Sequence, residues 1–184
     1  MAGTLVKQLR FDNGRQFEIV IANLLYESVD CIVNAANGGL AHGGGVAAQI
    51  EDAAGPALTA AGNKIIASRG RIPTGEAVLT TAGNLPFKGV IHAVGPRLGE
   101  GNEENKLVSA LLSSFRIAEE KGWSSLSFPG ISSGIFAVPV ATCARAYLRA
   151  VREFFEATPE SSLKHIRLCL MKGALLEAVR SEAA

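Results

Sequence analysis

Short apolar runs alternate along this chain with longer amphipathic stretches, and this alternation limits the possible folds more than any other feature. Runs such as 29–33, 89–94 and 165–170 have the length of buried strands. The stretches 103–121 and 140–155 instead repeat apolar residues at helical spacing. Because a helix between two strands carries the chain back across the sheet, the strands it joins run parallel. The sequence therefore predicts a mixed, mostly parallel sheet covered by helices on both faces.

The N-terminal region breaks this alternation. Residues 4–11 and 16–21 read as amphipathic strands, and they flank Asp12, Asn13 and Gly14, which have a turn composition. We therefore expect an antiparallel hairpin before the first parallel strand. The remaining predicted elements are helices over 46–54, 56–69 and 174–181 and strands over 77–81 and 125–128.

Length, charge and cysteine content limit the class of protein. A chain of 184 residues that is 48% hydrophobic has the size and apolar content of one domain, and we expect that domain to span 1–184. The net charge of +1 disfavours nucleic acid and membrane surfaces as partners. The N-terminus has no signal-peptide core, and no apolar run approaches the ~18 residues of a membrane span. The three cysteines are too widely spaced for a disulfide framework or a metal site. We expect a soluble, cytoplasmic monomer without a metal or organic cofactor.

The segment after the strand 29–33 has the composition of a phosphate-binding loop. Gly43, Gly44 and Gly45 immediately precede a predicted helix. Glycines let backbone N–H groups turn toward an anion, and the helix N-terminus adds the positive end of a dipole. A flexible turn is the alternative. Asn34 and Asn37 follow the strand, where they could hydrogen-bond a ribose diol or only cap the turn.

A second glycine-rich loop, 129–136, follows the strand 125–128. Its residues 130–134 match the G-x-S-x-G motif of serine hydrolases, and Glu153 or Glu156 followed by His165 would complete a triad in chain order. This interpretation is disfavoured, because the motif needs a helix directly after the serine and residues 136–139 delay the next one. The glycine run 43–48 also fits a dinucleotide fingerprint, but the acidic residue expected about 20 residues later is missing.

Four motifs, taken together and in this order, make the chain resemble a macrodomain. They are VDCIVNAAN at 29–37, HGGGVA at 42–47, VIHAVGP at 90–96 and SSGIF at 132–136. The resemblance extends from about residue 17 to 180 and covers nearly the whole chain. It implies a three-layer α/β/α sandwich whose cleft binds ADP-ribose.

The resemblance also implies a role for particular residues. Both glycine-rich loops would offer N–H groups to the diphosphate, Asn37 would bind the distal ribose, and Phe136 would pack against that sugar. Asn23 stands where the family commonly has an aspartate for the adenine amine, and a neutral acceptor there predicts weaker adenine recognition. Met171 would cover the adenine or only pack in the core. The expected ADP-ribose contacts are Asn23, Leu24, Ala35, Asn37, Gly43, Gly44, Gly45, Val46, Ser132, Ser133, Gly134, Ile135, Phe136 and Met171.

The resemblance leaves an enzyme and a binding module both open. Many relatives release ADP-ribose from acidic side chains or deacetylate O-acetyl-ADP-ribose, and others only bind. The aspartate of one enzymatic subclass is Ala47 here, but the HGGGVA loop resembles that of relatives that hydrolyse without it. Our leading hypothesis is a hydrolase acting on mono-ADP-ribosylated proteins, in which bound groups are positioned for a water polarised by the α-phosphate. Its expected catalytic residues are Asn37, His42, Gly45 and Phe136.

Three alternatives are kept at this point. His42 could equally be a structural hydrogen-bond partner, and His92, inside a predicted strand, is expected in the core rather than in catalysis. The whole protein could be a non-catalytic reader of ADP-ribosylated proteins. It could also be a poly(A) or RNA-binding module, which the near-neutral charge disfavours.

Overall fold

The computed structural model describes residues 3–184 and places seven strands in one sheet, in the order β1-β2-β7-β6-β3-β5-β4. The five inner strands pair in parallel, and β1 and β4 pair antiparallel at the two edges. The predicted mixed, mostly parallel sheet and its N-terminal hairpin are confirmed. The strands are β1 (Thr4–Arg10), β2 (Gln16–Ile21), β3 (Cys31–Ala36), β4 (Ala77–Thr80), β5 (Gly89–Val94), β6 (Ser125–Pro129) and β7 (His165–Leu170).

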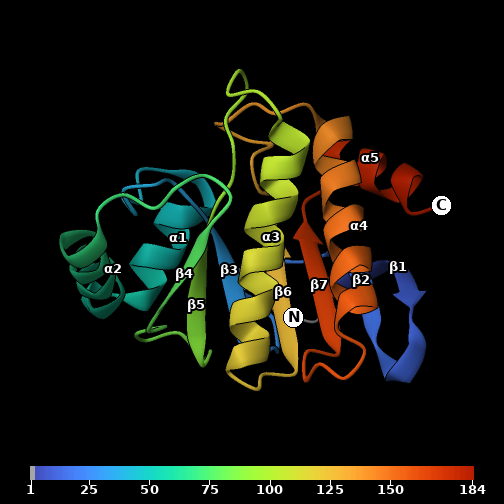
Figure 1. The fold of residues 1–184 in the computed structure, drawn as a ribbon, viewed down its shortest axis with the longest axis horizontal. Coiled ribbons are helices and arrows are strands. Elements are labelled where there is room, and N and C mark those ends of the chain that lie inside the picture. The colour runs from blue at the N-terminus through green and yellow to red at the C-terminus, as the bar shows by residue number, and fades with distance from the viewer. Residues whose placement is uncertain (1–2) are drawn as a thin grey trace.

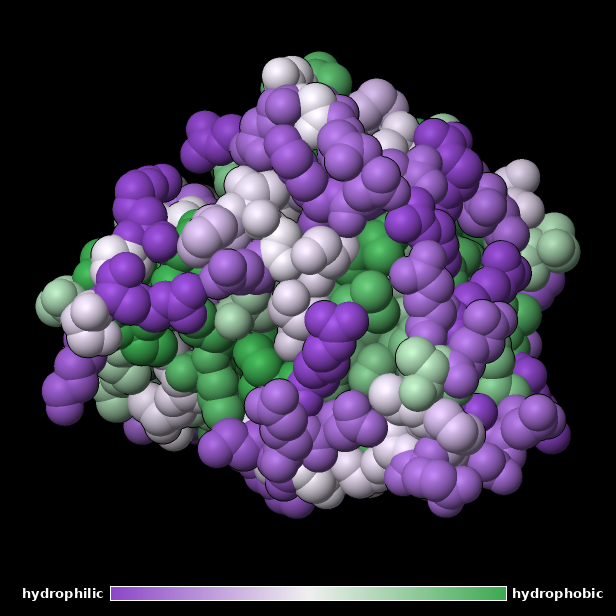
Figure 2. Space-filling view, in the orientation of Figure 1, coloured by the Kyte–Doolittle hydropathy of each residue, from purple (hydrophilic) through white to green (hydrophobic). Residues whose placement is uncertain are grey.

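Helices cover both faces of this sheet and make three layers. On one face lie α1 (Gly45–Ala54) and α2 (Pro56–Arg69). On the other lie α3 (Glu103–Glu120), α4 (Val140–Ala157) and α5 (Ala174–Glu182). Figure 1 shows α3 and α4 in front of the sheet, and Figure 2 shows that mostly hydrophilic residues cover the surface in the same view. Short 3-10 turns form at η1 (Asp12–Gly14) and η2 (Leu24–Tyr26). Within residues 3–184, no helix has the length and apolar content needed to cross a membrane.

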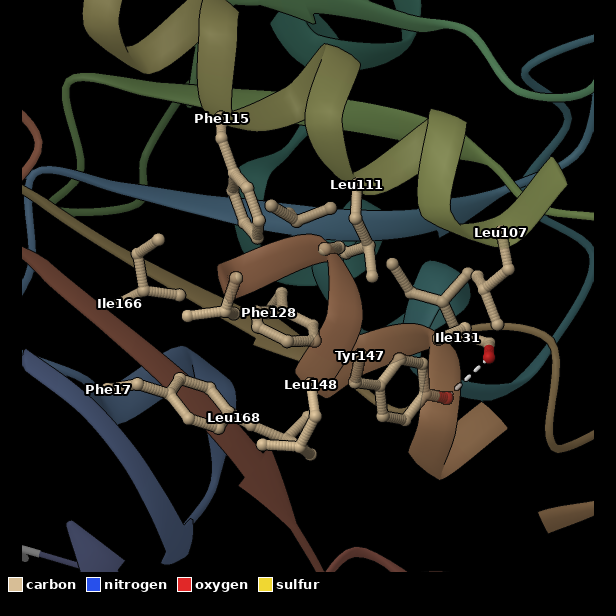
Figure 3. Packing of buried hydrophobic residues seen from close by; sticks show 14 of the residues in the cluster. Phe17, Leu107, Leu111, Phe115, Phe128, Ile131, Tyr147, Leu148, Ile166 and Leu168 are labelled. Carbon is tan, nitrogen blue, oxygen red and sulfur yellow. Dashed lines mark hydrogen bonds between the residues drawn. The ribbon is translucent and has the colours of Figure 1, made fainter. Parts of the chain in front are cut away.

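The larger core lies between the sheet and the α3, α4 and α5 layer. In Figure 3, Phe115 of α3 and Tyr147 of α4 approach Phe128 of β6 edge-on, with ring centroids 6.0 and 5.7 Å away. The inner strands read as continuous apolar runs because both of their faces are covered. Along β2, for example, Ile19 packs in this larger core and its neighbour Val20 packs under α1 on the other side.

One predicted boundary was wrong in a way that affects the site. The apolar run ends at Val33, but β3 continues through Asn34 to Ala36 because its ladder with β5 continues. Asn34 pairs in register with His92 and is 0% exposed. A buried polar residue in a strand interrupts the apolar pattern without ending the strand, because the neighbouring strand supplies its hydrogen bonds.

The carboxyl ends of the parallel strands meet at one edge of the sheet. The loops 37–44 and 130–139 both start there, directly after β3 and β6. Figure 1 shows the loops that follow the inner strands β5 and β6 at the top of the molecule, where the arrow of β7 points. Ligands of open α/β sheets bind at this edge.

Candidate functional site

A cleft of about 750 Å³ opens at the carboxyl edge of the sheet. Its walls come from the ends of β3, β6 and β7, from η2 and from the two glycine-rich loops. The fold therefore brings together residues far apart in the sequence, and all the ligand contacts expected from the sequence lie in these walls. They are Asn23, Leu24, Ala35, Asn37, Gly43, Gly44, Gly45, Val46, Ser132, Ser133, Gly134, Ile135, Phe136 and Met171.

The loop before α1 presents backbone N–H groups that lack partners. Gly45 adopts φ +59°, a conformation that glycine enters without a steric penalty. The N–H groups of residues 44–47 donate to no acceptor within residues 3–184, and the first bonded one is that of Ala48, 3.4 Å from the Gly44 carbonyl oxygen. Unpaired N–H groups at the start of a helix favour an anion, because the helix dipole is positive at this end.

The loop between β6 and α4 is closed by its own hydrogen bonds. The Ala137 N–H donates to the Gly134 carbonyl, and the Val138 N–H to the Ser132 carbonyl, both at 2.9 Å. Ser132 and Ala137 have φ of +68° and +59°, which costs a non-glycine residue about 1–2 kcal/mol. In the part of the chain that is described, the N–H groups of residues 132–136 have no acceptor. This loop therefore offers a second set of unpaired donors to the cleft.

The helix α4 fixes this second loop from below. Tyr147 is fully buried and donates its hydroxyl to the Ile131 carbonyl at 2.5 Å, the contact dashed in Figure 3. Burial raises the pKa of Tyr147 well above its ordinary value, so the hydroxyl remains a donor. The Cys143 thiol lies 3.8 Å from the same carbonyl. Sequence analysis missed Tyr147, because its apolar position in the helix gives no sign that the hydroxyl group reaches a loop.

The two loops approach each other across the cleft. A Cβ atom placed on Gly44 would lie 3.7 Å from Cδ1 of Ile135, which is 82% exposed. The two sets of unpaired N–H groups therefore belong to loops that nearly touch. A diphosphate carries negative charge on adjacent phosphoryl groups and suits two such sets of donors.

Asn37 uses most of its hydrogen-bonding capacity inside its own loop. Its Oδ1 accepts from the N–H groups of Gly39 and Ala41, both at 3.1 Å, and its Nδ2 donates to the Ala41 carbonyl at 2.7 Å. One Nδ2 hydrogen is left for a ligand. The side chain thus shapes the loop and lines the cleft at the same time.

Asn23 and Met171 line the cleft where the paired strands β2 and β7 end. The Asn23 Oδ1 accepts from the Leu25 N–H at 3.0 Å and caps η2, so one of its two lone pairs is already used. Met171 is 73% exposed, which excludes the alternative that it only packs in the core. Its thioether is free to lie against an apolar ring.

His42 lies beside the cleft and is not among its lining residues. The Nδ2 atom of Asn34 lies between the two histidines, 3.4 Å from Nδ1 of His42 and 3.0 Å from Nδ1 of His92. On its other side, the His92 ring places Nε2 2.8 Å from the Thr80 hydroxyl. Because the Thr80 hydroxyl donates to the Thr81 carbonyl, it accepts from His92 Nε2–H. Both Nδ1 atoms then accept from the Asn34 amide, which requires both histidines to be neutral.

The pKa values agree with this assignment. Burial, followed by the nearby His42, lowers the pKa of His92 to about 3, and burial also lowers the pKa of His42. The Asn34 Nδ2 group donates to the two rings, and the residue is 0% exposed and absent from the cleft lining. Of the two roles that the sequence left open for Asn34, the structure therefore does not favour the ribose contact. The arrangement favours the structural alternative for His42.

Arg97 is a cleft residue that the sequence analysis missed. Its guanidinium lies 4.5 Å from the centre of the Phe136 ring, and the Leu98 N–H donates to the Phe136 carbonyl at 2.8 Å. The loop after β5 therefore supports the second glycine-rich loop. The available signal was its place directly after the VIHAVGP motif at the end of a strand.

A serine hydrolase finds no support in the geometry. The Ser132 hydroxyl is buried with no hydrogen-bond partner in residues 3–184, and α4 begins only at Val140. His165, the candidate base, instead contacts Glu18 at 3.0 Å. Among the described residues, no three His, Cys, Asp or Glu side chains are grouped in a way that would hold a metal ion.

Comparisons with known proteins agree with the fold and with the cleft. A family model described as Macro domain matches residues 33–147. An O-acetyl-ADP-ribose deacetylase of Escherichia coli K12 is 44% identical over 149 residues, which cover 79% of this chain and 84% of that protein. A macro domain-containing protein of Caldanaerobacter subterraneus is 43% identical over 157 residues, or 84% and 88%. A Thermotoga maritima protein is 42% identical over 165 residues, which cover 89% of this chain but only 27% of that longer protein.

Solved structures extend the comparison. An Oceanobacillus iheyensis macrodomain with ADP superposes with a TM-score of 0.88 at 29% identity, covering 99% of this chain and 95% of that one. A Trypanosoma brucei macrodomain in complex with ADP-ribose gives 0.80 at 27% identity, covering 91% and 69%. The resemblance drawn from the four sequence motifs is therefore confirmed. This chain belongs to the macro domain family.

Proposed function

We propose that the cleft binds ADP-ribose and that its two loops hold the diphosphate. The observation that supports this most is the pair of facing loops whose N–H groups, at residues 44–47 and 132–136, have no acceptor in the described chain. These residues range from buried Ala47 and Ser132 to exposed Gly45 and Ile135, and an anion is the partner that suits a group of donors without acceptors. The O. iheyensis and T. brucei relatives, which were solved with ADP and ADP-ribose, support the same ligand.

We further propose that the chain hydrolyses esters at the distal ribose. Substrates of this kind are mono-ADP-ribosylated acidic side chains and O-acetyl-ADP-ribose, and the E. coli relative is named for the second. With the diphosphate between the loops, the distal ribose would lie at the end lined by Asn37, Gly45 and Phe136. The free Nδ2 hydrogen of Asn37 would orient a sugar hydroxyl, and the Phe136 ring, held by Arg97, would fix the sugar face.

For a glutamate ester, a water polarised by the α-phosphate would attack the anomeric carbon and give up a proton to that phosphate, while the bond from this carbon to the glutamate oxygen breaks and the glutamate leaves as a carboxylate. For O-acetyl-ADP-ribose, water would add to the acetyl carbonyl, the ribose oxygen would leave with a proton, and acetate would be released. Both reactions depend on positioning, which by itself lowers a barrier substantially. Neither requires a nucleophile from the protein. The thiol of Cys169, the one cysteine in the cleft wall, has its pKa raised by burial and remains protonated.

A non-catalytic reader is the second candidate, and one observation favours it. The cleft lining in residues 3–184 contains no aspartate, glutamate or histidine. A hydrolase of this form has no general base of its own and must use its substrate's phosphate. A protein that only recognises ADP-ribosylated partners needs no base.

One experiment separates the two candidates. Wild type and Asn37→Ala are incubated with a glutamate-modified protein and with O-acetyl-ADP-ribose, and released ADP-ribose and acetate are measured. Turnover by wild type with a loss on the order of 100-fold in Asn37→Ala is expected, because misplacing a bound group by about 1 Å costs that much. Asn63→Ala on α2, whose side chain is exposed, serves as the control. Tight ADP-ribose binding without any turnover would make the protein a reader.

A further inference from the structure

A second hollow opens beside the cleft, at the end where the distal ribose would lie. It has a volume of about 410 Å³ and shares Asn37, Arg97 and Phe136 with the cleft. Its other walls come from the segment after α2 and from the loop after β5. Any group attached to the distal ribose in the cleft would therefore point toward this hollow.

The exposed Arg71 lines the hollow, and its guanidinium lies against the loop that carries Asn37. A Cβ atom on Gly39 would lie 3.1 Å from Nη1 of Arg71, and one on Gly38 would lie 3.3 Å from Nη2. The Ile72 N–H donates to the Gly38 carbonyl at 2.7 Å. The guanidinium thus packs directly on the backbone of Gly38 and Gly39, which have no side chain to cover it.

Arg97 forms the boundary between the two spaces. The Arg97 guanidinium lies over the Phe136 ring. The backbone N–H of Arg97, not its side chain, donates to the Glu100 carboxylate at 3.2 Å. Glu100 is the one acid of the lining, and it also pairs with Lys106 at 3.7 Å. Within residues 3–184, neither Arg71 nor Arg97 lies within ion-pair distance of a carboxylate. The lining of the hollow therefore carries two guanidinium groups and one carboxylate, an excess of one positive charge.

We propose that this hollow binds acidic residues that flank the modified side chain of an acceptor protein. The inference rests on the proposed function and assigns a substrate class to it. Guanidinium groups match carboxylates in a two-pronged geometry and stay charged at every physiological pH. A peptide suits the hollow better than a nucleic acid, because Arg97 covers one face of the Phe136 ring and the distal ribose would cover the other, which leaves no free face for a base.

The test compares two synthetic peptides that carry ADP-ribose on the same glutamate through a non-hydrolysable linkage. One peptide has glutamates on both sides of this position, and the other has glutamines. The Kd of each is measured by calorimetry beside that of free ADP-ribose, at low and at high salt. We expect the acidic peptide to bind wild type about fivefold more tightly than its glutamine counterpart, as two exposed ion pairs allow. High salt should remove the difference.

Arg71→Gln is the decisive variant, because Arg71 lines the hollow and not the cleft. It should equalise the two peptides and leave the Kd of free ADP-ribose unchanged. Arg69→Gln is the control: it removes the same charge two residues along the chain, from an arginine that pairs with Glu76. This variant should keep the preference for the acidic peptide. Salt-independent or equal binding of the two peptides to wild type would overturn this inference and leave the proposed function standing.

If wild type does not bind free ADP-ribose, the proposed function is overturned and this inference with it. Tighter binding of an oligonucleotide that carries ADP-ribose on a terminal phosphate than of either peptide would also overturn the inference, since it would assign the hollow to nucleic acid.

Discussion

At the scale of single residues, the cleft depends on positions without side chains. Gly44 and Gly45 leave backbone N–H groups open, and only Gly45 needs its left-handed φ. Gly44 has φ 174°, an extended conformation that any residue adopts. A Cβ atom there would make only an ordinary contact with Ile135, at 3.7 Å, so the backbone and this neighbour both tolerate a small side chain, whereas a larger one would fill the space between the loops.

Gly44→Val should therefore spoil the site without unfolding the protein. The valine methyl groups would fill the gap toward Ile135 and keep the diphosphate from the N–H groups. We expect the Kd for ADP-ribose to rise at least about tenfold, equivalent to about 1.4 kcal/mol. The melting temperature should stay close to that of wild type. Titration calorimetry and thermal unfolding check both. Trimming the opposing side chain in Gly44→Val/Ile135→Ala should restore part of the affinity, and a double variant as weak as the single one would refute this steric account.

At the scale of elements, the second loop depends on α4. The buried Tyr147 hydroxyl holds the Ile131 carbonyl at the start of a loop that contains two residues with left-handed φ. A loop with strained residues keeps its shape only when neighbouring elements fix it. The helix therefore contributes to the cleft although its own side chains do not line it.

Tyr147→Phe should both destabilise the fold and weaken the site. The Ile131 carbonyl would lose a buried donor, which costs about 1–3 kcal/mol, and the loop 130–139 would lose its anchor. Urea unfolding should show the lost stability, and ADP-ribose should bind more weakly. Tyr26→Phe is the control, because Tyr26 is 73% exposed. Equal urea midpoints for Tyr147→Phe and wild type would show that the hydrogen bond is not the anchor.

Much of this element level could be predicted from the sequence. Apolar periodicity identified the strands and helices, and the four motifs identified the cleft walls, because both signals are local in the chain. The place of Asn34 inside β3 was missed because its hydrogen-bond partners, His42 and His92, lie outside its own strand. Arg97 and Tyr147 were missed for the same reason: each contacts a loop that only the tertiary fold brings near.

At the scale of the whole molecule, the buried His92 couples stability to pH. His92 is 0% exposed, and its pKa is lowered to about 3, first by burial and then by His42. Between this value and about 6.5, the ordinary pKa of histidine, the unfolded chain binds a proton that the folded chain does not. Stability is therefore complete above pH 6.5 and falls as the pH is lowered through this range.

Each pH unit in this window should cost about 1.4 kcal/mol for His92, so that about 2 kcal/mol is lost between pH 6.5 and pH 5. Few carboxylates titrate in that interval. Urea unfolding at several pH values measures the slope, and His92→Gln should show a smaller one. A wild-type stability that stays constant from pH 7 to pH 5 would mean that the histidine pair is not held neutral.

The central claim is that the two glycine-rich loops together form a diphosphate site. Calorimetric titration of wild type with ADP-ribose, ADP and AMP tests it most directly. We predict that ADP-ribose and ADP bind the same site and displace each other, whereas AMP, which reaches only one set of N–H groups, binds at least about tenfold more weakly. Equal affinity for AMP and ADP, or no heat of binding with ADP-ribose, would contradict the account.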